Sequence, residues 1–370
     1  MIVYFSFFAI SIFLYMWCVL LKNIGFNHMA ILPELLSGAF MGMVAGVRDL
    51  TVGTDVLFYM EPSFKYASLY PTFIDYWRVY HFEFLYAFLS YYIDKYTNNV
   101  TVFFFTLMGI TIFFVFLFIN NNFKDISPIF AFILFLFSFF NLALNYSRQM
   151  VAVAILLYAY IFLKKNQNFR FIVFVGIAFF FHATAILGLV ILPLYYFYKL
   201  KVRTRFLANL VGIFIFSLIL VFYNKILLLL INHQWINSKY IVHLTSGIDI
   251  QVVNIFFHFI IIIICLFMIN HASLKPKETL FFNEVCLLDF CLLMVSFFSD
   301  TAYRIELYSF AYLTILILPR CVKTLKVNKS SQLFWKIIVF LLFIVYWYIT
   351  IFVQNIGQTN PYTSAIFKIQ

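Results

Sequence analysis

The sequence contains few charged residues and little glycine or proline. Aspartate, glutamate, lysine and arginine together make up only 11% of its 370 residues, and there are 11 glycines and 8 prolines. Hydrophobic residues account for 65%, far above the share found in soluble globular domains. This composition excludes an ordinary soluble domain and indicates a protein built of membrane-spanning helices.

Motifs for nucleotide and metal binding are also missing. The sequence has no P-loop, no dinucleotide-binding glycine pattern, no HExxH and no DxD-like metal motif. Its five cysteines form no CxxC pair and no cysteine–histidine group with zinc spacing. We therefore expect no cofactor, no bound metal and no soluble nucleotide substrate, and we expect the thiols to be free and buried.

Apolar stretches recur along the whole chain, and each is long enough to cross a hydrocarbon core of roughly 30 Å. We predict ten transmembrane helices, at residues 2–21, 29–47, 100–119, 128–144, 147–163, 206–223, 252–270, 281–298, 303–319 and 333–353. No long polar segment separates them, so the expected fold class is all-α, with one polytopic transmembrane domain over residues 1–370. The first stretch lacks a basic n-region and a cleavage site, so we expect a retained helix.

The formal net charge of +11 comes from basic residues that cluster in short loops. These clusters lie at residues 164–170, 199–205, 275–277 and 320–329. Such a distribution is the positive-inside pattern, so these loops are assigned to the cytoplasm and nucleic acid is not an expected partner. Ten crossings then place both termini on the opposite, non-cytoplasmic side.

Two apolar segments do not fit simple crossings. Residues 171–198 have basic clusters on both flanks, so we predict a hairpin of two short helices that turns near His182, Ala183 and Thr184. A single tilted span is the alternative. Residues 82–93 are too short to cross, and we predict a re-entrant or interfacial helix on the outer side.

The few other charged residues gather in short motifs assigned to the outer face, where ionisable groups near hydrocarbon mark candidate sites. The first motif, RDLTVGTDVLFY, contains Arg48, Asp49, Asp55 and Tyr59. Its Gly53 allows a tight turn that side chains can stabilise. The functional interpretation is that Arg48 binds an anion while Asp55 and Tyr59 face a cavity. A structural turn with an Arg–Asp pair is the alternative.

The motif NYSRQ contains Asn145, Arg148 and Gln149 at the start of the predicted helix 147–163, which Asn145 or Ser147 can cap. Helix N-termini favour anions, and cations usually avoid them. An arginine at this position therefore indicates a phosphate-like partner. An interfacial arginine that reaches the lipid headgroups is the alternative.

Three further motifs hold candidate residues. His182 in FHATA can act as a general base, because histidine exchanges protons near neutral pH; a packed core histidine is the alternative. Glu83, at the start of the 82–93 helix, is a second acid–base candidate. The motif YRIELY contains Tyr303, Arg304 and Tyr308. Arg304 and Tyr308 share a helical face, and a structural ion pair of Arg304 is the alternative.

Taken in order, the motifs RDxxVGTDxxxY, FE, NYSRQ, FHATA and YRIxxY resemble those of the EpsG-like branch of Wzy-type polysaccharide polymerases, and the resemblance spans nearly the whole chain. It implies a GT-C-like glycosyltransferase of the bacterial inner membrane that makes O-antigen, capsule or exopolysaccharide at the periplasmic face. The implied partners are undecaprenyl-diphosphate-linked oligosaccharide and polysaccharide, the lipid bilayer and a chain-length regulator. In one departure, Phe84 and Leu85 follow the FE pair, where the family often has a small residue, proline or glycine.

The chemistry of these residues fits such a transfer. A diphosphate leaving group needs fixed positive charge, and the arginines of the motifs are forked cations suited to phosphate. The candidate bases for the acceptor hydroxyl are His182, Asp55 and Glu83. Direct displacement would invert the anomeric centre. The alternatives are a lipid-linked oligosaccharide flippase or other transporter, which also keeps charged residues in broken helices, and another membrane transferase.

Overall fold

The computed structural model describes residues 1–222, 225, 228–229, 252–295 and 303–369. Within these ranges the secondary structure is helical, apart from two isolated β-bridges. Eight helices of the described residues are long and apolar enough to cross a membrane. The fold is therefore all-α and polytopic, as the composition predicts.

Each of these eight helices coincides with one of the ten predicted spans. They are Ile2–Asn23 (α1), Asn27–Gly46 (α2), Val100–Asn121 (α6), Pro128–Asn145 (α7), Ser147–Lys164 (α8), Val252–His271 (α14), Arg304–Thr324 and Lys329–Val353. The predicted spans 206–223 and 281–298 fall on α11 (Val202–Val221) and α15 (Pro276–Val295). Both predictions run past these helices into residues outside the described part of the chain.

Shorter helices complete the described chain. They are η1 (Val56–Met60), α3 (Glu61–Lys65), η2 (Ala67–Leu69), α4 (Phe73–Tyr80), α5 (Phe84–Thr97), α9 (Asn168–Phe179), η3 (Ala183–Val190), α10 (Ile191–Tyr196) and η4 (Phe197–Lys199). The span Arg304–Thr324 is made up of α16 (Tyr303–Ala311), η6 (Tyr312–Ile317) and α17 (Leu318–Thr324), and the span Lys329–Val353 of α18 (Lys329–Tyr348) and η7 (Ile349–Val353). The short helix η8 (Ile356–Gln358) follows.

The chain forms two compact units. Unit 1 comprises Met1–Leu189, Thr314–Lys323 and Val327–Gln370, and unit 2 comprises Val190–Leu313 and Thr324–Lys326. The expected single transmembrane domain over residues 1–370 stays a prediction.

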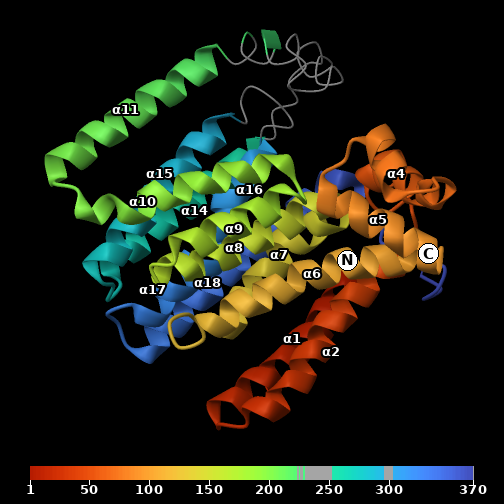
Figure 1. The fold of residues 1–370 in the computed structure, drawn as a ribbon. Helices are drawn as coiled ribbons and strands as arrows, with labels where there is room; N and C mark the ends of the chain where they lie inside the picture. The colour runs from red at the N-terminus through yellow and green to blue at the C-terminus, as the bar shows by residue number, and fades with distance from the viewer. Residues whose placement is uncertain (223–224, 226–227, 230–251, 296–302, 370) are drawn as a thin grey trace. The chain divides into compact units, whose positions relative to one another are not determined.

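In unit 1 the helices pack in sequence, with α1 on α2, α2 on α6, α6 on α8 and α8 on α9 (Figure 1). Helix α7 contacts α1, α6, α8 and α18. Apolar side chains bury α7 and α8 along most of their lengths, so these two helices form the core of the unit. Only Tyr146 separates them, so the end of α7 and the start of α8 lie together at one end of unit 1.

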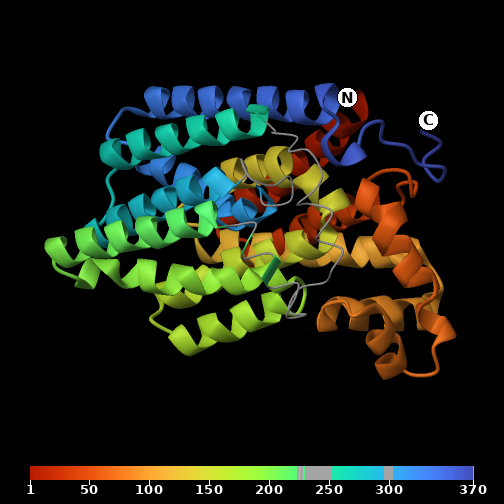
Figure 2. The ribbon, with the colours of Figure 1, turned by 90° about the horizontal axis from the view of Figure 1, so that it is seen from above.

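A cap of five short helices, η1 to α5, connects α2 to α6. Its own core consists of Ala67, Tyr76, Ala87 and Tyr91. The predicted re-entrant or interfacial helix corresponds to α5, which begins directly after the FE pair and ends at Asn98 in the left-handed conformation. Figures 1 and 2 both show α4 and α5 at the same end of unit 1 as the C-terminus.

The chain reverses direction after α9, as predicted for the turn near His182. Early in this segment, the ring of Phe174 stacks on Phe162 near the end of α8, with centroids 4.8 Å apart. At the turn, the carbonyl of Phe180 accepts a hydrogen bond of 2.9 Å from α5 of the cap. Helix η3 then returns along α8. Its Gly188 lies so close to α8 that an added Cβ would be 2.7 Å from the side chain of Leu156. A single straight span is excluded for this part of unit 1.

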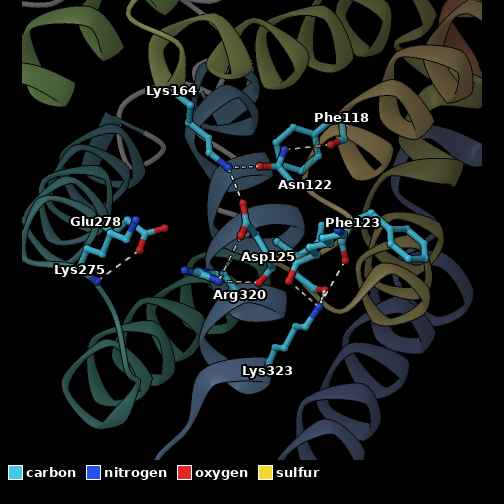
Figure 3. Close-up of polar contacts among 11 residues, drawn as sticks. Phe118, Asn122, Phe123, Asp125, Lys164, Lys275, Glu278, Arg320 and Lys323 are labelled. Atoms are coloured by element: carbon cyan, nitrogen blue, oxygen red, sulfur yellow. Dashed lines mark hydrogen bonds and ion pairs between the residues drawn. The ribbon is translucent and has the colours of Figure 1, made fainter. Parts of the chain in front are cut away.

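The opposite end of unit 1 carries basic residues from the loops assigned to the cytoplasm (Figure 3). Lys164 donates hydrogen bonds of 2.7 Å to both Asn122 and Asp125, and Arg320 donates one of 2.9 Å to the Asp125 carbonyl. Burial raises the pKa of Asp125, but Lys164, Arg320 and Lys323 outweigh it, so the net pKa is lowered. These contacts join the α6–α7 connection to the ends of α8 and α17.

In unit 2, α15 packs against α10, α11, α14 and α16. Residues 224–251, between the predicted spans 206–223 and 252–270, lie almost wholly outside the described residues. The described part of unit 2 contains the long helices α11, α14 and α15 and the short helices α10, η4 and α16.

Candidate functional site

Four of the predicted motifs meet at the cap end of unit 1. The FE pair, at the start of α5, contacts both the NYSRQ motif, at the α7–α8 junction, and the FHATA motif, at the hairpin turn. The VGTD turn contacts NYSRQ as well. Because these segments are far apart in sequence, their meeting depends on the packing of α5, α8 and α9 described above.

Glu83 is the centre of this cluster. Its Oε2 accepts a hydrogen bond of 2.7 Å from Arg148 Nη1, and its Oε1 lies 3.1 Å from His182 Nδ1. The backbone N–H of Ala183 also donates to Oε1, at 3.2 Å. The exposed fractions of the side chains are 18% for Glu83, 25% for Arg148 and 23% for His182, so the cluster is largely buried but reachable from outside.

The electrostatics of the cluster keep Glu83 ionised. Burial raises the pKa of Glu83, but the hydrogen bond with His182 and the charge of Arg148 outweigh it and lower the pKa to about 2. A carboxylate with so low a pKa is a weak base at neutral pH. Its two oxygens instead serve as acceptors, and Nδ1 of His182 must carry a proton to donate to it. The other ring nitrogen, Nε2, then has a lone pair to accept a proton.

Aromatic rings hold Arg148 in place. Its guanidinium lies 4.9 Å from the ring centre of Phe82 and 5.0 Å from that of Tyr86. The pKa of Tyr86 is raised by its burial, and Glu83 and Asp55 raise it further while Arg148 opposes them. Asp55, Glu83 and Arg148 therefore all lie within electrostatic reach of one buried phenol.

Asn145 fastens the VGTD turn to the α7–α8 junction. Its Oδ1 accepts hydrogen bonds of 2.8 Å from the Asp55 N–H and 3.3 Å from the Thr54 hydroxyl. The prediction that Asn145 or Ser147 caps α8 is wrong, because no side chain caps that helix and Ser147 donates to the Ala143 carbonyl instead. The amide oxygen of Asn145 is used between segments rather than within one helix.

Arg48 and Asp49, expected to bind substrate, make contacts within the protein. Arg48 is 5% exposed, donates hydrogen bonds to the carbonyls of Ala45 and Leu144, and lies 4.4 Å from the ring centre of Phe104. Burial lowers its pKa to about 10, although two tyrosines oppose the shift. Asp49 accepts a backbone N–H from the C-terminal segment. Both residues brace the end of α2.

The other two outer-face candidates of unit 1 differ in exposure. Tyr59 lies in the π-helical turn η1 of the cap and is 48% exposed, whereas Gln149 is buried in the first turn of α8. A π-helical turn is a common feature of functional sites. Tyr59 therefore has the exposure that contact with a ligand requires.

The motif YRIELY opens α16 and belongs to unit 2. Arg304 is half-buried and Tyr308 is buried, while Tyr303 lies in the first turn of the helix. Whether Arg304 and Tyr308 join the cluster around Glu83 stays a prediction.

A second polar cluster, buried in unit 2, was missed in the sequence. His258 Nδ1 forms a short contact with Glu306 Oε1, and the Ser309 hydroxyl donates a hydrogen bond of 2.6 Å to Asp289. His258 also stacks on Phe310, with ring centres 3.8 Å apart. His258 and Asp289 stand alone within apolar spans, so only their exceptional position in the membrane could have singled them out. The described residues contain no histidine, cysteine or carboxylate group arranged to hold a metal.

The fold and the cluster around Glu83 define a class of protein: polytopic, all-α membrane proteins with an Arg–Glu–His group at one end of the helix bundle. Residues 31–364 match the EpsG family, and the chain therefore belongs to that family. EpsG proteins are glycosyltransferase-like polysaccharide polymerases, so the role expected from the motifs is supported at this level. No curated protein and no solved structure matches the chain, and the GT-C-like fold stays a prediction.

Proposed function

We propose that this protein is a polysaccharide polymerase of the bacterial inner membrane with its active site at the periplasmic face. It transfers a growing glycan from undecaprenyl diphosphate to the non-reducing end of the next lipid-linked repeat unit, and it works with a chain-length regulator. The observation that carries the proposal is the contact of one carboxylate, Glu83, with both Arg148 and His182. Such a group places a cation and a proton acceptor side by side, which transfer from a diphosphate requires.

His182 is the base in this proposal, and Glu83 positions it. Of the three candidate bases, Glu83 is engaged with both neighbours and titrates near pH 2. A carboxylate bound to Nδ1 fixes the tautomer and orientation of the imidazole, as in other acid–base pairs. Nε2 of His182 then accepts the proton of the acceptor hydroxyl. General-base catalysis of this kind contributes about 10²–10⁴-fold in rate.

Arg148 is the cation that binds the diphosphate. A guanidinium has five N–H donors, and Nη1 of Arg148 donates to Glu83, which leaves further donors for phosphate oxygens. In the transfer, the acceptor oxygen forms a bond to the anomeric carbon while the bond from that carbon to the diphosphate breaks. The electron pair leaves with the diphosphate, whose new charge Arg148 stabilises, and the anomeric centre inverts.

The remaining candidates receive different roles. Asp55 and Tyr59, on the cap beside Arg148, contact the acceptor sugar, and Asp55 already interacts electrostatically with Arg148. Asn145, Arg48 and Asp49 shape the site without touching substrate, because Oδ1 of Asn145, both Nη atoms of Arg48 and the carboxylate of Asp49 bond to protein groups. Gln149, Tyr303, Arg304 and Tyr308 remain candidates for substrate binding.

A lipid-linked oligosaccharide flippase or other transporter is the second candidate. Buried carboxylate and histidine side chains within membrane helices are frequent in transporters, and His258, Asp289 and Glu306 form such a set in unit 2. A flippase moves the lipid-linked unit between leaflets without forming a glycosidic bond, so the two candidates differ in their products.

Reconstitution with purified lipid-linked repeat units tests the proposal. The wild-type protein should form products longer than one repeat, with and without EDTA, and Arg148→Ala should slow this by about 10²–10³-fold. Lys164→Ala, at the opposite end of α8, is the control and should keep the wild-type rate. Translocation of the lipid-linked unit with no lengthening would contradict the polymerase and favour the flippase.

A further inference from the structure

The C-terminal segment, residues 354–369, folds back onto the first outer motif. The N–H of Asp49 donates to the Thr363 carbonyl and the N–H of Gly53 donates to the Gln358 carbonyl, each at 3.0 Å. The carboxylate of Asp49 accepts the N–H of Ala365 at 2.9 Å. Two backbone N–H groups and one side-chain carboxylate of residues 49–53 therefore bond to this segment, at Asp49 before the VGTD turn and at Gly53 within it.

Gly357 of the same segment packs closely against the side chain of Asn145. Gly357 has a φ of +73°, and a Cβ added there would lie 2.8 Å from Asn145 Nδ2. On the other side, Gly53 has a φ of +107°, and its Cβ would lie 3.3 Å from Asn145 Oδ1. Two glycines from distant parts of the chain thus enclose one amide, which in turn holds the N–H of Asp55 at 2.8 Å. Side chains at either glycine would displace this amide.

Further polar contacts anchor the segment to the core of unit 1. The Thr359 carbonyl accepts the hydroxyl of Tyr4 on α1, and the Thr359 hydroxyl accepts a hydrogen bond of 3.0 Å from Asn141 on α7. Thr359 is fully buried. These contacts hold the segment against α1 and α7, as a role in positioning the site requires.

The family match points the same way. It extends through the C-terminal segment to residue 364, but it leaves out residues 1–30, which contain the first transmembrane helix. Residues 354–364 of the C-terminal segment therefore belong to the part of the chain that matches the family.

We infer that residues 354–369 are a clasp that positions the acceptor side of the active site, with Asn145 as the positioning residue. The inference rests on the proposed function, in which Asp55 contacts the acceptor. The clasp holds Asn145, Asn145 holds the backbone of Asp55, and the Asp55 side chain stands beside Arg148. Within the described part of the chain, the side chains of Glu83 and His182 form their hydrogen bonds with Arg148, Ala183 and each other and not with the clasp, so we expect their geometry to be independent of it.

Gly357→Ala is the variant that opens the clasp, and Gly109→Ala is its matched control. The new methyl group at 357 meets Asn145 and forces an alanine into the left-handed region, whereas nothing lies within 4 Å of a Cβ at Gly109 in α6. In hydrogen–deuterium exchange, Gly357→Ala should speed exchange of residues 49–56 at least tenfold, and Gly109→Ala should leave it unchanged. Unchanged exchange of residues 49–56 in Gly357→Ala would refute the proposed clasp. The exchange measurement does not require enzymatic activity.

Kinetics with lipid-linked acceptor complete the test. Gly357→Ala should raise the acceptor KM at least tenfold while the pH profile of kcat keeps its wild-type shape, because His182 and Glu83 stay in place. Asn145→Ala should do the same, and adding Gly357→Ala to it should change little more, because both act on one contact. Additive effects, or a normal acceptor KM despite faster exchange, would overturn the positioning role. An inactive wild-type protein would instead refute the proposed function, and the exchange measurement would still decide the clasp.

Discussion

At the scale of single residues, the partners of a charged side chain indicate whether it supports the fold or is able to bind a ligand. Arg48 and Arg148 are both arginines at the outer ends of helices, and the sequence offers no reason to treat them differently. In the folded chain, the two Nη atoms of Arg48 donate to backbone carbonyls, and its guanidinium lies over an aromatic ring. Arg148 has a carboxylate partner and stays 25% exposed. The second arrangement can bind an anion without leaving buried carbonyls unpaired.

Glu83→Gln should lower both stability and activity. The pKa of Glu83 in the folded protein, about 2, lies below its ordinary value of 4.5. Its ionised form therefore stabilises the fold, on the order of 3 kcal/mol, fully above pH 4.5 and progressively less as pH falls towards 2. Thermal unfolding in detergent at pH 4 to 8 should show a constant deficit for Glu83→Gln above pH 5 that narrows in more acid buffer.

Glu61→Gln in helix α3 of the same cap is the control for this comparison, and it should match the wild type at every pH. A deficit of Glu83→Gln that grew on acidification would mean that the carboxylate is not held ionised by Arg148 and His182. Turnover of Glu83→Gln should fall by about 10²-fold, because the imidazole loses a charged partner.

At the scale of helices, polar groups buried between spans fix how the helices pack. In unit 2, His258 on α14 meets Glu306 on α16, and Ser309 on α16 meets Asp289 on α15. Helix α16 is therefore tied to two neighbours by buried polar contacts one turn apart. Such contacts specify the register of packed helices, which uniform apolar surfaces do not.

His258→Ala should destabilise unit 2 by about 1–3 kcal/mol, because it leaves the buried Glu306 carboxyl without its hydrogen-bond partner. The loss should be much smaller when Glu306→Ala is added, since the pair is then removed together. Thermal unfolding followed by size-exclusion chromatography measures both. His271→Ala, at the exposed end of the same helix, is the control. Equal unfolding of the two histidine variants would contradict a buried pair.

At the scale of the whole molecule, the membrane topology divides unit 1 into two chemically different ends. The cap, the α7–α8 junction, the hairpin turn and the C-terminal segment share one end, and the basic contacts of Asp125 occupy the other. The positive-inside pattern assigns the basic end to the cytoplasm. On this assignment, we expect the proposed active site to face the periplasm.

Labelling of single cysteines tests this orientation. In a variant with the five native cysteines replaced, Tyr66→Cys in the cap should react with a membrane-impermeant maleimide in intact cells. Lys124→Cys, in the connection between α6 and α7, should react only after the membrane is permeabilised. Both positions are exposed, so access to the reagent depends only on side. Labelling of both in intact cells, or of Lys124→Cys alone, would contradict the assignment.

The sequence predicts the membrane spans and the motifs, but not which residues of different motifs contact each other. Uniform apolar runs determine where helices cross, because hydrocarbon thickness sets their length, and eight predicted spans coincide with helices. The cap was read as an outer loop plus one helix, since residues 54–80 show no long periodic pattern. Its short helices are held by tertiary packing around Tyr76 and Tyr91 instead.

Contacts between residues far apart in the sequence could not be predicted, because hydrophobic periodicity and helix-capping patterns report only on neighbouring residues. Glu83 and His182 are 99 residues apart, and Asn145 binds a residue 90 positions earlier rather than capping its own helix. The local motif alone suggested an anion site at Arg48. The burial of this side chain depends on α6 and α7, which the motif does not contain. His258 passed as one residue in an apolar run, because its partner Glu306 lies 48 positions away.

The start of α1 and the C-terminal segment both lie at the cap end, since Tyr4 reaches the carbonyl of Thr359. Affinity tags or fluorescent reporters fused to either terminus would therefore lie at the same end of unit 1 as the proposed active site. The connection between α8 and α9 is short, exposed at Lys165 and Asn166, and lies at the far end of unit 1. An engineered handle placed there leaves both extremities of the polypeptide native.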